Sequence, residues 1–519
     1  MTNNNMNNNL QEDVNPQGEA YYMPEYNKHR SQTLETTLSS VIDCDDDYNY
    51  DNEEFKAATQ ISAKEGNPSM NNNNHITTHY IILSHGWLGS PQEMAYVQQA
   101  IESKISSMDD SFPQSVRVVV HSATSNHKRT HDGIANGGKR LANEIESFIL
   151  NDLLMTNNGD DNGGDDDDDD GSIFCTQSRR HIHVGLSIIG YSLGGLYGRY
   201  ALSCLPSQLT AVTKNEVKMN IMLHYNIFMT IATPHLACTN HTYMNLPRFV
   251  EWIFGSMCSK TGKDLFCSKK ITRRMKKKQQ SVVNSHKDEN NLIFEMGTNY
   301  ETFLKPLSQF KKRVTYVNAF QTDFQVPTST AAFLSDDSTH PHFLRTSTLT
   351  ESDDCPFVVA MLQTRMDNDV VQSDVNLSSY HDLTKHAQDL IMSNKLDALG
   401  WDKIFIDSRD MNPIPGVPKG ICSKDHRLGW KNYCQDFIEK PSKDNEEFQN
   451  DTSSFQLHSS SIKSKDVKHF MTKRGRKIQI PVGHCMLIAN SKSKGAEKFY
   501  SNGRQIVDVM VTSFLGELL

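Results

Sequence analysis

The stretch VGLSIIGYSLGGLYGRYAL, residues 184–202, decides the fold. Its first six residues form a continuous apolar run that suits a strand buried on both faces, and its last ten residues suit a helix. Between them lies the Gly-x-Ser-x-Gly pattern of Gly190, Ser192 and Gly194. Small residues two positions before and after a serine let backbones crowd around a sharp strand-to-helix turn that exposes the hydroxyl. The stretch therefore predicts a nucleophile elbow with Ser192 at its tip.

Apolar runs and helical spacing alternate along the chain on both sides of this elbow. Strands are predicted at residues 80–83, 116–120, 181–190, 221–232, 314–320 and 478–489. Helices are predicted at residues 134–150, 193–205 and 505–515. Such alternation is typical of an α/β protein with a mostly parallel, doubly wound sheet. Together with the elbow it predicts the α/β-hydrolase fold.

Several segments do not fit the alternation, in agreement with a hydrophobic share of only 37%. Residues 1–74 are rich in Asn, Asp, Glu and Ser, and we expect them to form a disordered N-terminal arm. Residues 75–519 are predicted to form one hydrolase domain. We expect that domain to carry an acidic loop at 157–172, a small cap with a basic insertion at 236–300, and a polar insertion at 411–476.

Charge and cysteine content exclude several classes of protein. A net charge of −9 argues against general nucleic-acid binding, which favours a broad positive face. Ten cysteines without regular spacing do not indicate a disulfide framework. The sequence shows no secretory signal and no apolar run long enough to span a membrane. We therefore expect a cytoplasmic protein whose contact with a membrane or a lipid droplet is peripheral.

Attack by Ser192 on a carbonyl would create an oxyanion that needs two backbone N–H donors. The residue after the nucleophile, Leu193, is the first expected donor, because its N–H lies at a helix N-terminus. The second is expected in the loop HGWLGS, residues 85–90, where Trp87 directly follows the pair His85 and Gly86.

The elbow also predicts that an acid and then a histidine follow the serine along the chain. Asp323 follows the strand predicted at 314–320 and is the preferred acid, with Asp336 and Asp337 as alternatives. His484 lies ahead of the terminal helix and is the preferred base. The other late histidines lie in polar or surface-like sequence: His381, His386, His458 and His469. In this arrangement His484 accepts the proton of Ser192, and Asp323 holds the imidazole in the required tautomer.

The chain resembles the "putative serine esterase" family of lipase-like domains found in fungi and plants. The resemblance rests on HGWLGSPQEM at 85–94, THDGI at 130–134, GYSLGGLYGRYA at 190–201, ATPHLA at 232–237, the 318–327 loop, WDKI at 401–404 and the segment around His484. It implies the α/β-hydrolase fold, a Ser–Asp–His triad at Ser192, Asp323 and His484, and hydrolysis of glycerolipids or other acyl esters.

The expected function is therefore a serine esterase or lipase that needs no cofactor and no metal. An acyl thioesterase and a catalytically silent interaction protein of the same fold remain alternatives. The apolar stretch at 246–254 and the basic run Lys269–Lys278 are candidates for peripheral membrane contact. The segment 133–140 begins like a phosphate loop, but Arg140 occupies the position that needs Ser or Thr, so no nucleotide site is expected.

Overall fold

A computed structural model describes residues 78–108, 116–157, 180–212, 218–238, 259–266, 292–323, 325–345, 357–373, 383–411, 428–435, 457–473 and 482–518. All of them belong to one compact unit, Asn73–Leu519. Four predictions fall outside the described residues: the disordered arm at 1–74, nearly all of the acidic loop, the apolar stretch at 246–254 and the basic run Lys269–Lys278.

The described strands form one sheet with the order β10-β7-β8-β9-β6-β5-β3-β1-β2, and β4 pairs with β5 beside that path. The strands are β1 Thr78–Ser84, β2 Arg117–Ser122, β3 Arg180–Tyr191, β4 Gln208–Val212, β5 Lys218–Ile231, β6 Lys312–Asn318, β7 His342–Arg345, β8 Val358–Gln363, β9 Asp402–Ile406 and β10 Leu457–Ile462. The run from β9 to β2 is parallel throughout. Only β4, β7, β8 and β10 pair in the antiparallel sense. This mostly parallel sheet confirms the predicted fold class.

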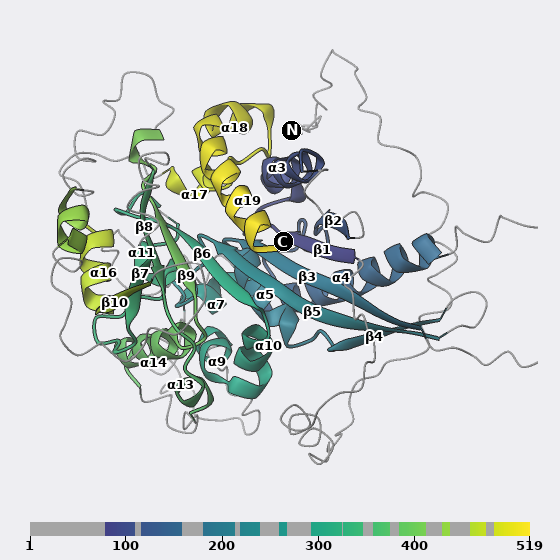
Figure 1. Ribbon diagram of the computed structural model, residues 1–519, viewed down its shortest axis with the longest axis horizontal. Coiled ribbons are helices and arrows are strands. Elements are labelled where there is room, and N and C mark those ends of the chain that lie inside the picture. The colour runs from purple at the N-terminus through teal and green to yellow at the C-terminus, as the bar shows by residue number, and fades with distance from the viewer. Residues whose placement is uncertain are drawn as a thin grey trace, which may run out of the picture. The chain divides into compact units, whose positions relative to one another are not determined.

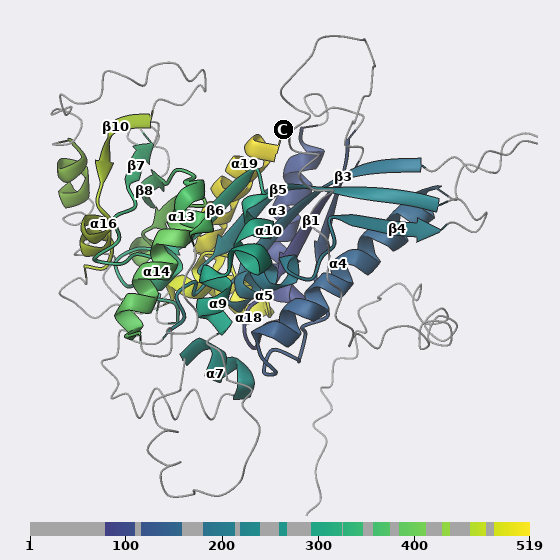
Figure 2. The ribbon, with the colours of Figure 1, turned by 90° about the horizontal axis from the view of Figure 1, so that it is seen from below.

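Helices cover both faces of the parallel strands (Figures 1 and 2). One face carries α3 Ala95–Ser106 and α19 Arg504–Leu518, and the other carries α4 Ile134–Asn157 and α5 Leu193–Leu202. The remaining helices are η3 Pro91–Met94, α7 Ser259–Phe266, α9 Leu292–Thr298, η4 Tyr300–Leu304, α10 Lys305–Ser308, α11 Thr328–Ala331, α13 Asn368–Gln372, α14 Lys385–Asp397, η6 Arg409–Met411, α16 Ser464–Met471, α17 Gly483–Met486, α18 Lys494–Phe499 and η7 Ser501–Gly503.

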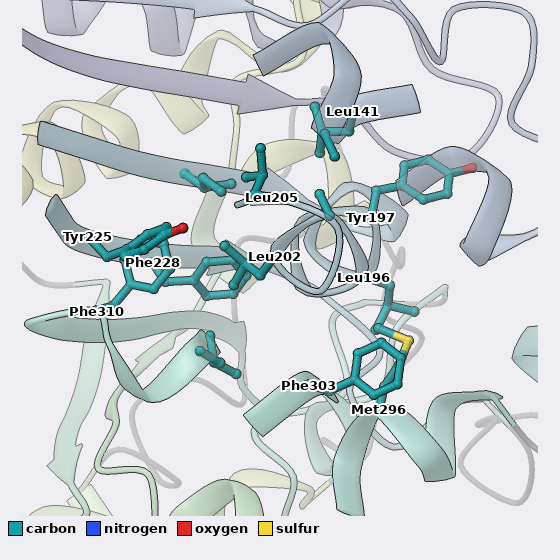
Figure 3. Packing of buried hydrophobic residues seen from close by; sticks show 14 of the residues in the cluster. Leu141, Leu196, Tyr197, Leu202, Leu205, Tyr225, Phe228, Met296, Phe303 and Phe310 are labelled. Carbon is teal, nitrogen blue, oxygen red and sulfur yellow. The ribbon is translucent and has the colours of Figure 1, made fainter. Parts of the chain in front are cut away.

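Helix α5, which follows the elbow, is buried on nearly every side. Figure 3 shows Leu196 pointing away from the helix toward Met296 and Phe303, whereas the ring of Tyr197 points away from the helix on a different side. The one charged residue of α5, Arg199, is also buried and donates to the backbone oxygen of Met296 at 2.7 Å. A helix that is apolar all round is stable only inside a protein, so the core holds α5 and the elbow in place.

The alternation predicted from the sequence is confirmed at every parallel strand that it named, at α4, at α5 and at α19. The strand predicted at 478–489 is wrong. Residues 474–481 lie outside the described part, Val482 makes a single bridge to Asp323, and the chain then turns into the short helix α17. The polar insertion at 411–476 contains β10, which pairs with β7 in the sheet, and α16, whose Val467 lies in the same hydrophobic cluster as Ile462 of β10. None of the described helices is long and apolar enough to cross a membrane.

A buried ion pair joins β9 to the end of α14. The ammonium of Lys403 lies 2.5 Å from the carboxylate of Asp397, and both side chains are fully buried. Lys403 also donates to the backbone oxygen of Ala332 and contacts the imidazole of His342 at 2.9 Å. Burial lowers the pKa of Lys403 to about 8 and raises that of Asp397 to about 7, and the mutual attraction opposes both shifts.

Removing one partner of this pair should destabilise the domain far more than removing both. We expect Lys403→Met to lower the free energy of unfolding by about 3–5 kcal/mol, because Asp397 then remains as an uncompensated buried charge. The double variant Lys403→Met with Asp397→Leu should regain most of that loss. Urea unfolding of the two variants tests this, and a single variant as stable as the parent protein would contradict it.

Candidate active site

The predicted site residues other than His484 follow the carboxyl ends of neighbouring parallel strands, which meet at one edge of the sheet. Ser84, the last residue of β1, pairs with Gly190, and Tyr191, the last residue of β3, pairs with Ile231 of β5. The loop at 85–90 and the elbow therefore begin side by side. The loop that contains Asp323 follows β6, which is the next strand beyond β5. Ligand sites of open α/β sheets form at this edge.

Ser192 lies in a backbone conformation that residues other than glycine rarely adopt, with φ 53° and ψ −123°. Its backbone N–H donates to the backbone oxygen of Ile231 at 2.8 Å, and its backbone oxygen accepts from the N–H of Gly195 at 3.2 Å. Conformations of this kind cost about 1–3 kcal/mol and persist only where the surroundings impose them. The serine is thus held in the strained turn that the sequence predicted.

Two glycines of the elbow lie too close to other backbone atoms to carry a side chain. A Cβ atom on Gly190 would lie 2.4 Å from the Cα of Gly195. One on Gly194 would lie 2.1 Å from the oxygen of Ser84 at the end of β1. The small residues at these positions therefore permit the close approach of the elbow to β1.

The carboxylate of Asp323 is completely buried and receives four hydrogen bonds. Its Oδ1 accepts from the backbone N–H groups of Gln325 and Val326, each at 2.8 Å. Its Oδ2 accepts from the side-chain amide of Asn318 at 3.2 Å and faces Nδ1 of His484 at 2.7 Å. Because a carboxylate can only accept, Nδ1 of His484 carries the proton. In the neutral imidazole, that tautomer leaves the lone pair on Nε2.

His484 reaches Asp323 because its short helix is fastened to the acid loop. The N–H of Gly483 donates to the oxygen of Thr322 at 3.0 Å, and Val482 forms a bridge with Asp323. The imidazole packs against the ring of Tyr191, the residue before Ser192, with ring centroids 4.9 Å apart. No hydrogen bond joins the Ser192 hydroxyl to His484 among the described residues. Such bonds are often long before a substrate binds.

Leu193 begins α5, so its N–H is one of the four at that helix end without an intrahelical partner. In the loop of 85–89, the oxygen of Gly86 accepts from the ring of His85 at 3.0 Å and from the N–H of Gly89 at 3.2 Å. Since a trans peptide is planar, these two bonds also fix the opposite direction of the Trp87 N–H. Burial lowers the pKa of His85, which favours the neutral imidazole donating through Nδ1.

The alternative acids and bases lie in different surroundings. Asp336 and Asp337 are exposed and bind Lys468 and His386 respectively. His469 is exposed on α16. His381 lies outside the described residues, as does the side chain of His458. Of the candidates that the structure describes, only Asp323 and His484 lie together next to the elbow.

Sequence reasoning missed the residues that support the acid. Asn318, the last residue of β6, donates to Asp323, and its own side-chain oxygen accepts from Ser408 at 3.2 Å. A Cβ atom on Gly483 would lie 2.7 Å from each of these two side chains. The only available signal was that Asn318 and Ser408 follow apolar runs, which many residues with no role also do.

Within the described part of the chain, no group of three or more His, Cys, Asp or Glu side chains is arranged to hold a metal ion.

The close contact at Gly194 generates a prediction. We expect Gly194→Ala to lower the free energy of unfolding by about 1–3 kcal/mol, because the added methyl overlaps backbone atoms that cannot rotate away. Gly516→Ala is the matched control, since a Cβ there meets nothing within 4 Å. Urea unfolding of both variants checks this, and equal stability of the two would contradict the contact.

The solved structures that are similar to this chain include two of the phospholipase PlaB from Legionella pneumophila, one in complex with thio-NAD. The complex is 10% identical, with a TM-score of 0.23, and the match covers 50% of this chain and 42% of that one. The other is 11% identical, with a TM-score of 0.23, covering 50% and 44%. This chain thus spans less than half the length of either. Among curated proteins, none matches.

The family comparison is more extensive. Residues 74–337, slightly more than half of the chain, match the family model described as "Putative serine esterase (DUF676)". The match includes the loop at 85–90, the elbow and Asp323, and it ends before His484. The chain belongs to the putative serine esterase family DUF676.

Proposed function

We propose that this protein hydrolyses carboxylic esters of lipid-like substrates through an acyl-enzyme on Ser192. The observation that carries the proposal is the strained elbow of Ser192 beside a histidine that is bound to a buried carboxylate at 2.7 Å. The strained backbone of Ser192 and the nearby carboxylate of Asp323, which accepts four hydrogen bonds, serve no evident purpose in packing. They are what activation of a weak nucleophile requires.

In the first half-reaction, Nε2 of His484 takes the proton of Ser192 as its oxygen attacks the ester carbonyl carbon. The N–H groups of Leu193 and Trp87 stabilise the oxyanion, and Asp323 stabilises the imidazolium. His484 then gives the proton to the departing alcohol as the carbon–oxygen bond breaks. In the second half-reaction, water attacks the acyl-enzyme by the same steps, and the carboxylic acid is released.

A lipid-like substrate is supported by Leu88, which directly follows the proposed donor Trp87. Its side chain is 59% exposed, and its φ is 57°, in the left-handed region. An exposed leucine in a strained turn has no role in the core. An apolar acyl chain bound at this loop would cover it and gain from the burial.

Reaction with a fluorophosphonate probe tests the nucleophile. We expect the parent protein to be labelled and Ser192→Ala not to be. Asp323→Asn should slow labelling by a factor on the order of 10³–10⁴, because an amide favours the wrong imidazole tautomer. Asp336→Asn is the matched control, since Asp336 is exposed and bound to Lys468, and it should react like the parent.

Absence of labelling in folded parent protein would refute the proposed function and favour a catalytically silent interaction protein. A panel of oxygen esters and thioesters of equal chain length then separates an esterase from a thioesterase.

The role of Leu88 predicts a change in chain-length preference. Leu88→Ser should lower kcat/KM for a dodecanoyl ester about fivefold, and that for an acetyl ester little, because only a long chain covers this side chain. Leu428→Ser is the control, since that leucine is similarly exposed, at 56%, on a different segment. Equal losses for both esters would contradict the role of Leu88.

A further inference from the structure

Glu93 is a buried carboxyl group that the proposed mechanism does not use. It belongs to η3, which follows the loop of His85–Gly89, here called the oxyanion loop, and it is 8% exposed. Its carboxyl group lies directly against that loop: a Cβ atom on Gly89 would be 2.2 Å from Oε2. A buried carboxyl is costly unless its surroundings compensate for it, so its position beneath this loop needs an explanation.

The compensation comes from the loop itself and from the segment that follows the base. Burial raises the pKa of Glu93, and four groups oppose the rise: Lys492 and His484 through electrostatic interaction, the side chain of Asn490 and the backbone of Gly86. The backbone oxygen of Glu93 also accepts from the N–H of Ser491 at 3.4 Å.

Lys492 contacts the oxyanion loop directly. Its ammonium donates to the backbone oxygen of Leu88 at 2.7 Å. On the other side of the same residue, the N–H of Leu88 donates to the hydroxyl of Thr130 at 3.0 Å. The turn that carries the Trp87 N–H is therefore held from two sides, with Glu93 packed beneath it.

We propose that Glu93 and Lys492 are positioning residues that hold the oxyanion loop against the segment 489–492 and so direct the Trp87 N–H toward the oxyanion. This inference rests on the proposed ester hydrolysis. It adds that one stretch, from His484 to Lys492, places both the base and the second oxyanion donor. A shift of that stretch would therefore displace two parts of the site together.

Four variants test the proposal. Lys492→Met removes the bond to Leu88, and Lys492→Arg retains a donor. Glu93→Leu removes the polar carboxyl group, and Glu93→Gln retains a polar side chain of the same shape. Lys498→Met is the control for charge, because Lys498 is exposed on α18, outside the oxyanion loop and the segment 489–492.

The readout compares the affinity for a transition-state analogue with the KM of the substrate. A trifluoromethyl ketone with the acyl chain of the substrate forms an oxyanion on Ser192, whereas KM reports the ground state. We expect Lys492→Met and Glu93→Leu to lower kcat and ketone affinity about tenfold with KM unchanged, which is less than the loss of a whole donor. Lys492→Arg, Glu93→Gln and Lys498→Met should stay close to the parent.

Two outcomes would overturn the proposal. One is a loss of ketone affinity no greater than the change in KM. The other is amide hydrogen exchange in residues 85–89 that is no faster in Lys492→Met than in the parent protein. The exchange measurement does not depend on activity, so it tests whether Lys492 holds the oxyanion loop even if Ser192 proves unreactive. An unreactive Ser192 would be a separate failure, that of the proposed function. Urea unfolding of each variant confirms that the folded domain is compared.

Discussion

The strained backbone of Ser192 is the constraint on which the rest of the site depends. A positive φ at a serine is unfavourable by itself, so the turn exists only because neighbouring backbones close around it. The end of β1 approaches so closely that Gly194 has no room for a side chain, and β5 accepts the N–H of Ser192. Three parallel strands therefore have to be in register before the turn can form. The same register places the loop of residues 85–89, which leaves β1, next to Ser192.

The positions of Asp323 and His484, the proposed acid and base, do not follow from the sheet in the same way. Neither lies in a regular element longer than one helical turn, so sheet register alone does not place them. Asp323 is oriented by its own loop, because two N–H groups from the residues that follow hold one of its oxygens. His484 arrives from far along the chain and is fastened by the contact between Gly483 and the same loop. The site thus joins a rigid turn, set by the sheet, to a loop pair set by hydrogen bonds.

Much of the fold could be predicted because buried parallel strands are continuous apolar runs, as in residues 80–83 and 184–189. The antiparallel strand β7 escaped prediction because it has only four residues, β10 because its middle is polar, and β9 because Asp402 and Lys403 leave it an apolar run of only three residues. Only the packed structure shows that Asp397 compensates the charge of Lys403. For residues 482–489 the error was the opposite one: a strand was predicted where the structure has none. Their apolar character reflects burial against α19 and η3, not strand pairing, and the contacts of Gly483 and Gly503 impose a helical turn.

Chain order predicted which acid and which histidine to consider, since the elbow restricts both to the residues after Ser192. It carried no information on Asn318, Ser408, Glu93 or Lys492. Polar residues of these types occur throughout the chain, and their contacts depend on segments hundreds of positions apart, such as Leu88 and Lys492. Supporting residues are defined by three-dimensional neighbours, whereas the elbow is defined by spacing within five residues. That difference explains why Ser192 could be predicted from the sequence and the residues that support the site could not.

The place where each insertion joins the sheet determines what it can affect. The acidic segment connects the end of α4 to Arg180, the first residue of β3, and Ser192 follows the last residue of that strand. Twelve strand residues at about 3.3 Å each separate its attachment point from Ser192 by about 40 Å. The segment between Cys238 and Ser259 instead joins the chain soon after the carboxyl end of β5. Sequence changes in the acidic segment can therefore leave the proposed chemistry unaffected. The segment between Cys238 and Ser259 is attached at the edge where a substrate would bind, so changes there can affect binding.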